Sequence, residues 1–453
     1  SYRGGVALEY PDKLSLEEAR LLPRVLSTKP SVKKLWILKL SLSAFRAAFD
    51  KLQDWGSLEE LLIWHIDSEG EDFDVDLSGA FDKLRVLELR CETISISFAR
   101  KIGNYLRESR SLQELSLWDS CGGDEGAEAI AEALTVNSTL KKLTLLGQKL
   151  TSQTLVAFAK ALVVNTTLEL VDLFDTFSVD KEKPSFLFEE DLYSDVFKII
   201  RILWTQEVLP ELTRLILETR HCSQVSVSVT ASVDKDILRE FFEAVASSTA
   251  LDLLHFYPSE NCFDELADGI AFVVERTATL QEVLNLMHVE AGSERQLVRV
   301  LDALKVNRSV ARFSMYVELL TPEIAKSLSD LLAVNDALSD VAVCEYWGIS
   351  SEIVQTILGG LRKNHTLTGI TVSWDPDEDV GIDEMKELLK KNGRLLDLAV
   401  KFVTGERIDT EAADAANKLG SSASLVNRLR ELTGKTTETV LGDLHAALAR
   451  LSV

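Results

Sequence analysis

The sequence predicts an α/β array in which helix–strand units stack side by side on a shared parallel sheet. Residues 126–173 contain one such unit twice, offset by 28 residues. A short aliphatic strand pattern then recurs along most of the chain. Neither the helix nor the strand of such a unit can bury its apolar side alone, so neighbouring units must cover one another.

The first half of the repeated unit has the apolar spacing of one helix face, with positions i, i+3, i+4 and i+7 apolar in both copies. These positions are Ala127, Ile130, Ala131 and Leu134, then Leu155, Phe158, Ala159 and Leu162. Asn137 and Asn165 follow the last apolar position, where asparagine can take the left-handed conformation that ends a helix. Each copy is therefore expected to contain one helix.

The second half of the unit is expected to be a short strand whose alternate residues point inward, as at Leu143 and Leu145. Its template, L-x-x-L-x-L with aliphatic substitutes, begins at Val32, Leu58, Leu84, Leu112, Leu140, Leu168, Leu212, Leu251, Leu280, Val310, Leu338, Leu367 and Leu395. Most intervals between these positions are 26 to 30 residues. A period this regular excludes most folds built around a single core.

Composition indicates a soluble globular chain and narrows the range of partners that it can bind. The 453 residues are 46% hydrophobic and 27% charged, and 72 acidic residues against 49 basic ones give a formal charge of −23. Such a field repels nucleic acid and anionic membrane surfaces, so a protein partner with a basic surface is expected instead. No apolar run reaches the length of a membrane span, and no signal-like stretch opens the chain.

The five cysteines, Cys91, Cys121, Cys222, Cys262 and Cys344, are odd in number and irregularly spaced. They form none of the terminal cystine clusters of secreted arrays, which favours free thiols and a cytoplasmic location.

Three segments are expected along the chain. An N-terminal helical cap covers residues 1–31, where Ser15 and Glu18 have capping-box spacing. The repeat array covers 32–403, and amphipathic helices over 404–453 form the C-terminal cap.

Two long intervals predict insertions in the array, near residues 175–191 and 219–236. The second contains alternating Val225, Val227 and Val229, which is a strand-like pattern. Residues 66–80 are too rich in glycine and aspartate to predict a good helix.

Helices and strands alternating every 28 or 29 residues, with Asn-x-Ser/Thr-Leu between them, resemble the ribonuclease-inhibitor-like leucine-rich repeats. The helix entry GDEGA at residues 123–127 points the same way. The resemblance spans roughly residues 32–403 and implies a horseshoe with an inner parallel sheet and outer helices. Gln148 stands where the family usually has asparagine after a strand, so irregular turns are expected. Ribonuclease inhibition itself is not implied, because the inhibitor is rich in cysteine and this chain is not.

The residue after the third template position of each strand should face solvent on the inner, concave side. Large apolar and aromatic residues dominate this column in the first half of the chain, as exposed interaction sites often do. With acidic neighbours, the candidate partner-binding residues are Trp64, Trp118, Leu146, Phe174, Tyr257, Tyr316, Asp119, Asp172 and Asp175. The alternative is that an inserted segment, such as residues 177–188, folds back over the column.

Four N-x-S/T sequons begin at Asn137, Asn165, Asn307 and Asn364, all at the same place in the repeat. Helix termination explains them without glycans. The motif Gly434-Lys435-Thr436 lacks the first glycine of a phosphate-binding loop. Neither a metal-ligand spacing nor a known catalytic pattern occurs, so no cofactor, no metal and no enzymatic activity are expected.

The sequence therefore predicts a non-catalytic scaffold that recognises a protein through its concave face and insertions. Two alternatives stay open: a GTPase activator of the Ran type, and the ligand-sensing C-terminal part of an innate immune receptor, because both resemble this repeat type. The sequence specifies neither the partner nor the oligomeric state.

Overall fold

The computed structural model describes residues 6–49, 57–91, 94–118, 122–146, 150–173, 199–218, 223–258, 263–289, 294–317, 319–345, 349–372 and 381–449. The chain divides into two compact units, Ser1–Glu211 and Leu212–Val453.

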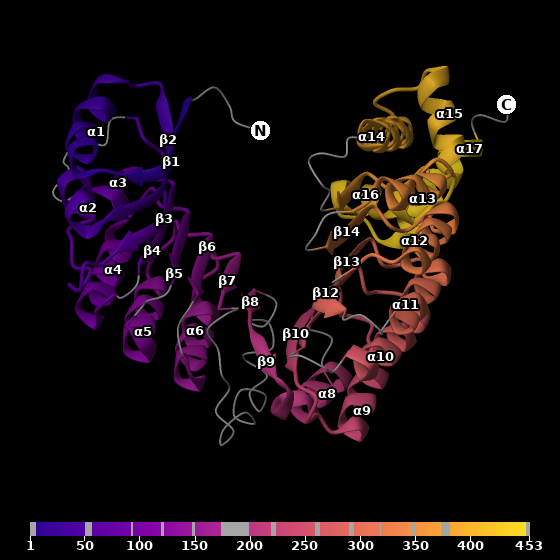
Figure 1. The fold of residues 1–453 in the computed structure, drawn as a ribbon, viewed down its shortest axis with the longest axis horizontal. Helices are drawn as coiled ribbons and strands as arrows, with labels where there is room; N and C mark the ends of the chain where they lie inside the picture. The colour runs from indigo at the N-terminus through magenta and orange to yellow at the C-terminus, as the bar shows by residue number, and fades with distance from the viewer. Residues whose placement is uncertain are drawn as a thin grey trace. The chain divides into compact units, whose positions relative to one another are not determined.

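The first unit is a parallel sheet whose strands follow one another in chain order from β1 to β8. Its strands are β1 (Val6–Leu14), β2 (Val32–Ser41), β3 (Glu60–Asp67), β4 (Val86–Cys91), β5 (Glu114–Trp118), β6 (Lys142–Leu146), β7 (Leu170–Asp172) and β8 (Ile200–Arg201). Its helices are α1 (Leu16–Thr28), α2 (Leu42–Phe49), α3 (Ser78–Lys83), α4 (Ile96–Glu108), α5 (Gly123–Leu134) and α6 (Ser152–Val164). Within this unit the helices lie along one side of the strands (Figure 1).

The second unit repeats this arrangement with strands β10 to β15, again parallel and paired in chain order. The connecting elements are β9 (Leu203–Thr205), a 3-10 turn (Gln206–Val208) and α8 (Leu209–Glu218). The strands are β10 (Gln224–Val229), β11 (Leu253–Pro258), β12 (Glu282–Val289), β13 (Arg312–Val317), β14 (Asp340–Glu345) and β15 (Gly369–Val372). The helices between strands are α9 (Lys235–Ser247), α10 (Phe263–Arg276), α11 (Glu294–Val306), α12 (Pro322–Val334) and α13 (Ser351–Leu361).

The core lies between each sheet and its helices because strand side chains alternate in direction. Leu143 and Leu145 are both 0% exposed, as the template predicts. The capping box of Ser15 and Glu18 is also confirmed at the start of α1.

A buried polar ladder joins successive repeats at the turn from helix to strand. Asn165 Nδ2 donates to the carbonyls of Leu134 and Asn137 in the preceding repeat, while its Oδ1 accepts from the amides of Thr167 and Leu168. Asparagine serves the same purpose at 137, 307, 335 and 364. Where the repeat has Ser248 or Thr277, the hydroxyl accepts a hydrogen bond from the corresponding turn amide, that of Leu251 or Leu280.

The ladder explains the four sequons structurally, but the expected left-handed conformation is wrong. Asn165 is extended, with φ −86°, and Asn137, Asn307 and Asn364 also lack a positive φ, because their side chains cap the turn by hydrogen bonds instead. The four asparagines are only 4–6% exposed, and each Nδ2 is engaged with buried backbone. Buried backbone groups need such partners, and here a side chain supplies them where the helix ends.

The structure corrects three details of the sequence interpretation. The N-terminal segment contains β1 beside α1, because β1 covers the edge of β2 by parallel pairing. The pattern at Leu212 lies within α8, and that at Leu395 lies within α14 (Ile382–Thr404). By contrast, the valines at 225, 227 and 229 form β10, as their alternation predicts.

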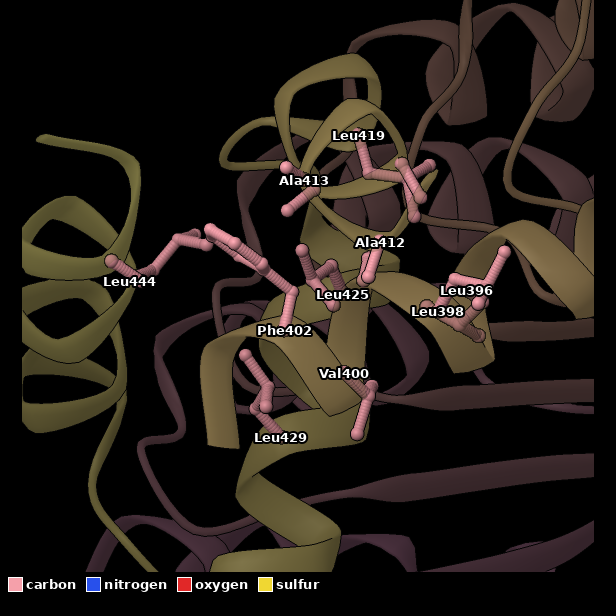
Figure 2. Packing of buried hydrophobic residues seen from close by; sticks show 14 of the residues in the cluster. Leu396, Leu398, Val400, Phe402, Ala412, Ala413, Leu419, Leu425, Leu429 and Leu444 are labelled. Carbon is pink, nitrogen blue, oxygen red and sulfur yellow. The ribbon is translucent and has the colours of Figure 1, made fainter. Parts of the chain in front are cut away.

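The C-terminal helices are α14, α15 (Thr410–Leu419), α16 (Ala423–Thr433) and α17 (Thr437–Ala449). They share a small apolar core in which Phe402, Leu425 and Leu444 are at most 7% exposed (Figure 2). Helix α16 also bonds back to the array, since Asn427 donates to Gln281 and the Ser424 amide to the Asp336 carbonyl. None of the helices in the described part of the chain has the length and apolar character to span a bilayer.

Candidate protein-binding surface on the first sheet

Strands β2, β3 and β5 place tryptophan side chains, and β4 places Arg90, on the face of the first sheet opposite its helices. Their neighbours Ile37, Ile63, Leu89 and Leu117 are 0–1% exposed and fill the core, so the alternate residues face the other way. Parallel pairing sets Arg90 directly beside Trp118.

Three indoles and one guanidinium form a continuous stack on this face. The rings of Trp36 and Trp64 meet edge to face at 5.3 Å. The guanidinium carbon of Arg90 lies 5.1 Å from the centre of the Trp64 ring and 3.6 Å from that of Trp118. A cation over an indole face is attracted by the negative potential of the ring. We call Trp36, Trp64, Arg90 and Trp118 the aromatic row.

Exposure differs along the row. Trp64 is 43% exposed, whereas Trp36 and Trp118 are half-buried. The expectation that Leu146 is exposed is wrong, because it is only 7% exposed. It pairs in register with Trp118, and neighbouring strands lie about 4.8 Å apart, so the larger indole is close enough to cover the shorter leucine.

The other predicted residues are not all brought together by the structure. Asp172 ends β7 on the first sheet and is half-buried. Tyr257 belongs to β11 in the second unit, where it is half-buried near His255. The remaining predictions lie outside the described residues: Phe174, Asp119, Asp175 and the side chain of Tyr316.

Sequence reasoning missed Trp36 and the bridging role of Arg90. Trp36 lies two positions before Leu38 on β2, so the alternation of the strand already places it on the same face. The contact of Arg90 with both indoles depends on rotamers and on strand pairing, which no spacing in the sequence encodes.

At the starts of the strands, charged side chains form a ladder that neutralises itself. Glu60 pairs with Lys34 and with Arg85, and Glu114 pairs with Arg85 and with Lys142. These side chains are partly or largely exposed, so each pair contributes little to stability. The ladder leaves little net charge on this side of the aromatic row.

Carboxylates without such a ladder lie on the other sides of the row. Glu9 on β1 pairs in register with Trp36 and is exposed. Asp67 ends β3, three residues after Trp64, and begins an acidic segment that contains six carboxylates between residues 67 and 76. Hydrogen bonds from Ser78 hold the pKa of Asp76 below its ordinary value, so this group stays ionised. Glu71 and Asp74 of this segment are paired with Arg46 and Lys101, and the remaining carboxylates make the surroundings of the row negative.

The corresponding face of the second sheet carries charged residues beside the aromatic Tyr257. Glu282 on β12 lies between Arg312, with which it forms an ion pair, and His255, whose Nε2 is 3.5 Å away. Burial alone would raise the pKa of Glu282, but hydrogen bonds from His255 and Arg312 hold it below its ordinary value. Burial raises the pKa of Asp340 on β14. The two sheets thus present different chemistry.

Parallel strands with an L-x-x-L-x-L pattern, alternating with helices, define a leucine-rich-repeat-like α/β protein. No protein-family model matches the chain, and no curated protein matches it. Similar solved structures include actin-binding site 2 of leiomodin-1, at 14% identity over 41% of this chain and 90% of that one, with a TM-score of 0.27. The C-terminal domain of tropomodulin from Caenorhabditis elegans matches at 14% identity over 42% and 96%, with a TM-score of 0.26. The yeast Rad7–Elc1 complex matches at 14% identity over 74% and 86%, with a TM-score of 0.38.

Proposed function

We propose that this protein is a non-catalytic scaffold that binds a protein partner through the aromatic row of the first unit. The observation that carries the proposal is the exposure of Trp64, at 43%, on a sheet face where polar side chains would be expected. Exposed apolar surface flanked by polar groups is typical of interaction sites, and tryptophan and arginine are enriched among the residues that dominate binding energy.

The stacking of the row supports this function physically. Trp36 and Arg90 contact Trp64 from two sides, so the indole loses little conformational freedom when a partner covers it. A binding group that is already ordered makes association more favourable, because less side-chain entropy is lost.

The charges around the row favour a partner with a basic surface. Glu9 and Asp67 flank the indoles, whereas the charged ladder at the strand starts neutralises itself. The net charge of −23 adds a long-range field of the same sign. Complementary charges speed association and fix the orientation of a partner. We therefore expect its basic groups to dock on the sides of Glu9 and Asp67.

We further propose that the two units are parts of one leucine-rich-repeat solenoid, a horseshoe that functions in the cytoplasm. Small-angle X-ray scattering of the purified chain tests the shape, since a curved solenoid scatters differently from two units that move independently. A scattering profile that requires independent units would contradict this part of the proposal without affecting the aromatic row.

The test compares binding by wild type and two variants. A partner is isolated on immobilised wild-type protein, purified, and titrated by calorimetry. Trp64→Ala should weaken binding by about 2 kcal/mol, roughly thirtyfold, as loss of a central aromatic anchor does. The matched control is Leu21→Ala, which removes an apolar side chain that is 59% exposed on α1 of the same unit. Unchanged affinity in Trp64→Ala would refute binding through the aromatic row. Binding that is insensitive to salt would refute the basic surface proposed for the partner.

A further inference from the structure

A groove of about 540 Å³ opens between helices on the outer layer of the second unit. Leu238 and Phe242 of α9 and Phe272 of α10 form its apolar floor. Its rim is charged, with Lys235 and Arg239 from α9 and Arg299 from α11. The volume lies within the range of pockets that hold small molecules.

An aromatic ring lies at the contact of α9 with α10 beside the groove. A side-chain carbon at Gly269 of α10 would lie 1.9 Å from the ring of Phe242, so the ring occupies the space that the glycine leaves empty. At the contact of α12 with α13, the same space at Gly360 is taken by the backbone of Ser329. A side-chain ring thus fills the space at the α9–α10 contact, whereas helix backbone fills it at the α12–α13 contact.

The ring of Phe242 is itself held in place. The ring of Phe242 packs against Phe256 at 5.4 Å and against Phe241 at 5.9 Å, and it is 3% exposed. Filling the groove by rotation of Phe242 would break these contacts. The groove is therefore a preformed feature of the second unit, as ligand sites usually are.

The charges on the α9 side of the groove favour an anion. Lys235 and Arg239 are one helical turn apart, a like-charge spacing that destabilises a helix. Lys235 is also the first residue of α9, where a cation opposes the helix dipole. Asp236 pairs with Arg239 at 3.1 Å, but both side chains are at least 64% exposed, which weakens this compensation. Glu243 and Asp268 complete the rim, and Asp268 pairs with Arg299.

We propose that this groove binds a small amphiphilic anion, with its hydrocarbon or aryl body on the floor and its carboxylate or sulfonate at Lys235 and Arg239. The apolar floor accommodates the hydrocarbon or aryl body, and the cationic end binds the carboxylate or sulfonate. This site is independent of the aromatic row and does not rest on the function proposed above.

The probe is decanoate, titrated by calorimetry into the full-length protein below its micellar concentration. Decyltrimethylammonium, with the same alkyl chain and the opposite charge, is the matched ligand control. Decanoate should bind, and it should slow hydrogen exchange in α9 and α10 but not in α12 and α13. Decyltrimethylammonium should bind at least tenfold more weakly.

A variant with Lys235→Gln and Arg239→Gln should weaken decanoate binding at least tenfold without loss of fold, because both side chains are exposed. The matched protein control is Lys386→Gln with Lys390→Gln on α14, where two exposed lysines have the same spacing and each pairs with an acid three residues earlier. This control should stay within twofold of wild type. The proposal is overturned if decanoate does not bind, if the cationic amphiphile binds equally well, or if the groove variant binds like the control.

Discussion

Replacing Asn335 tests whether the polar ladder holds neighbouring repeats together. This side chain is 3% exposed and makes four hydrogen bonds to backbone. Its Nδ2 donates to the carbonyls of Leu304 at 2.7 Å and Asn307 at 3.1 Å, both in the preceding repeat. Its Oδ1 accepts from the amides of Ala337 at 2.9 Å and Leu338 at 2.8 Å in its own turn.

Asn335→Ala removes all four bonds and leaves two amides and two carbonyls in the interior. At about 1 kcal/mol for each bond, the expected loss of stability is about 4 kcal/mol. Asn335→Ser should lose about half as much, because a hydroxyl can still accept from the turn amides, as Ser248 does from Ala250 and Leu251. The matched control is Asn417→Ala, whose side chain is exposed on α15 and should change stability by less than about 0.5 kcal/mol.

Hydrogen exchange in peptides from α12 and β14, measured across a urea series, reports the stability of the second unit separately from that of the first. The reasoning is refuted if Asn335→Ala costs less than about 1 kcal/mol. It is also refuted if the serine and alanine variants are equally unstable, because the turn amides would then contribute nothing.

Other expected outcomes follow from the same structure. Leu145→Ala should lower the unfolding free energy by about 2–5 kcal/mol in denaturant titrations, because it empties a fully buried aliphatic site. Mass spectrometry of folded protein from a secretory host should find no glycan on Asn165, since Nδ2 is committed to two buried carbonyls. Thiol titration in denaturant without reductant should count five free cysteines, and a count of three or fewer would contradict a reducing location. The pKa of Glu282 lies below its ordinary 4.5, so its ionised form adds stability above that pH, which is lost as pH falls through the lower folded value. Thermal melts between about pH 2 and 7 cover the ordinary titration range of carboxyl groups. Over this range, acid should lower the melting temperature of Glu282→Gln less than that of wild type.

The sequence places Trp118 in the column expected to face solvent, but its side chain is half-buried in the structure. Its half-buried ring lies 3.6 Å from the Arg90 guanidinium, so truncation removes a cation–aromatic contact as well as exposed surface. Trp118→Ala should therefore reduce stability by roughly 1–2 kcal/mol. The more exposed Trp64 is the cleaner probe of binding.

The sequence by itself determined the repeating unit, because burial on alternating faces leaves a period that can be read directly. Leu143 and Leu145 are buried as the strand pattern requires, and Asn137 and Asn165 mark the helix ends. The same alternation placed Trp64 on the open face of its strand. These features depend on contacts that every repeat makes with the next one.

Only the tertiary structure decided what happens where the repetition ends or where separate strands meet. Asn392-Gly-Arg-Leu395 has the local pattern of Asn364-His-Thr-Leu367, and Asn392 still donates to the Leu367 carbonyl. Yet the helix continues through it, since a helix satisfies its own backbone groups and its apolar face packs on α15 to α17. The stacking of Arg90 between Trp64 and Trp118 likewise joins three strands. Local pattern cannot specify either outcome, because both depend on neighbours that are distant in the chain.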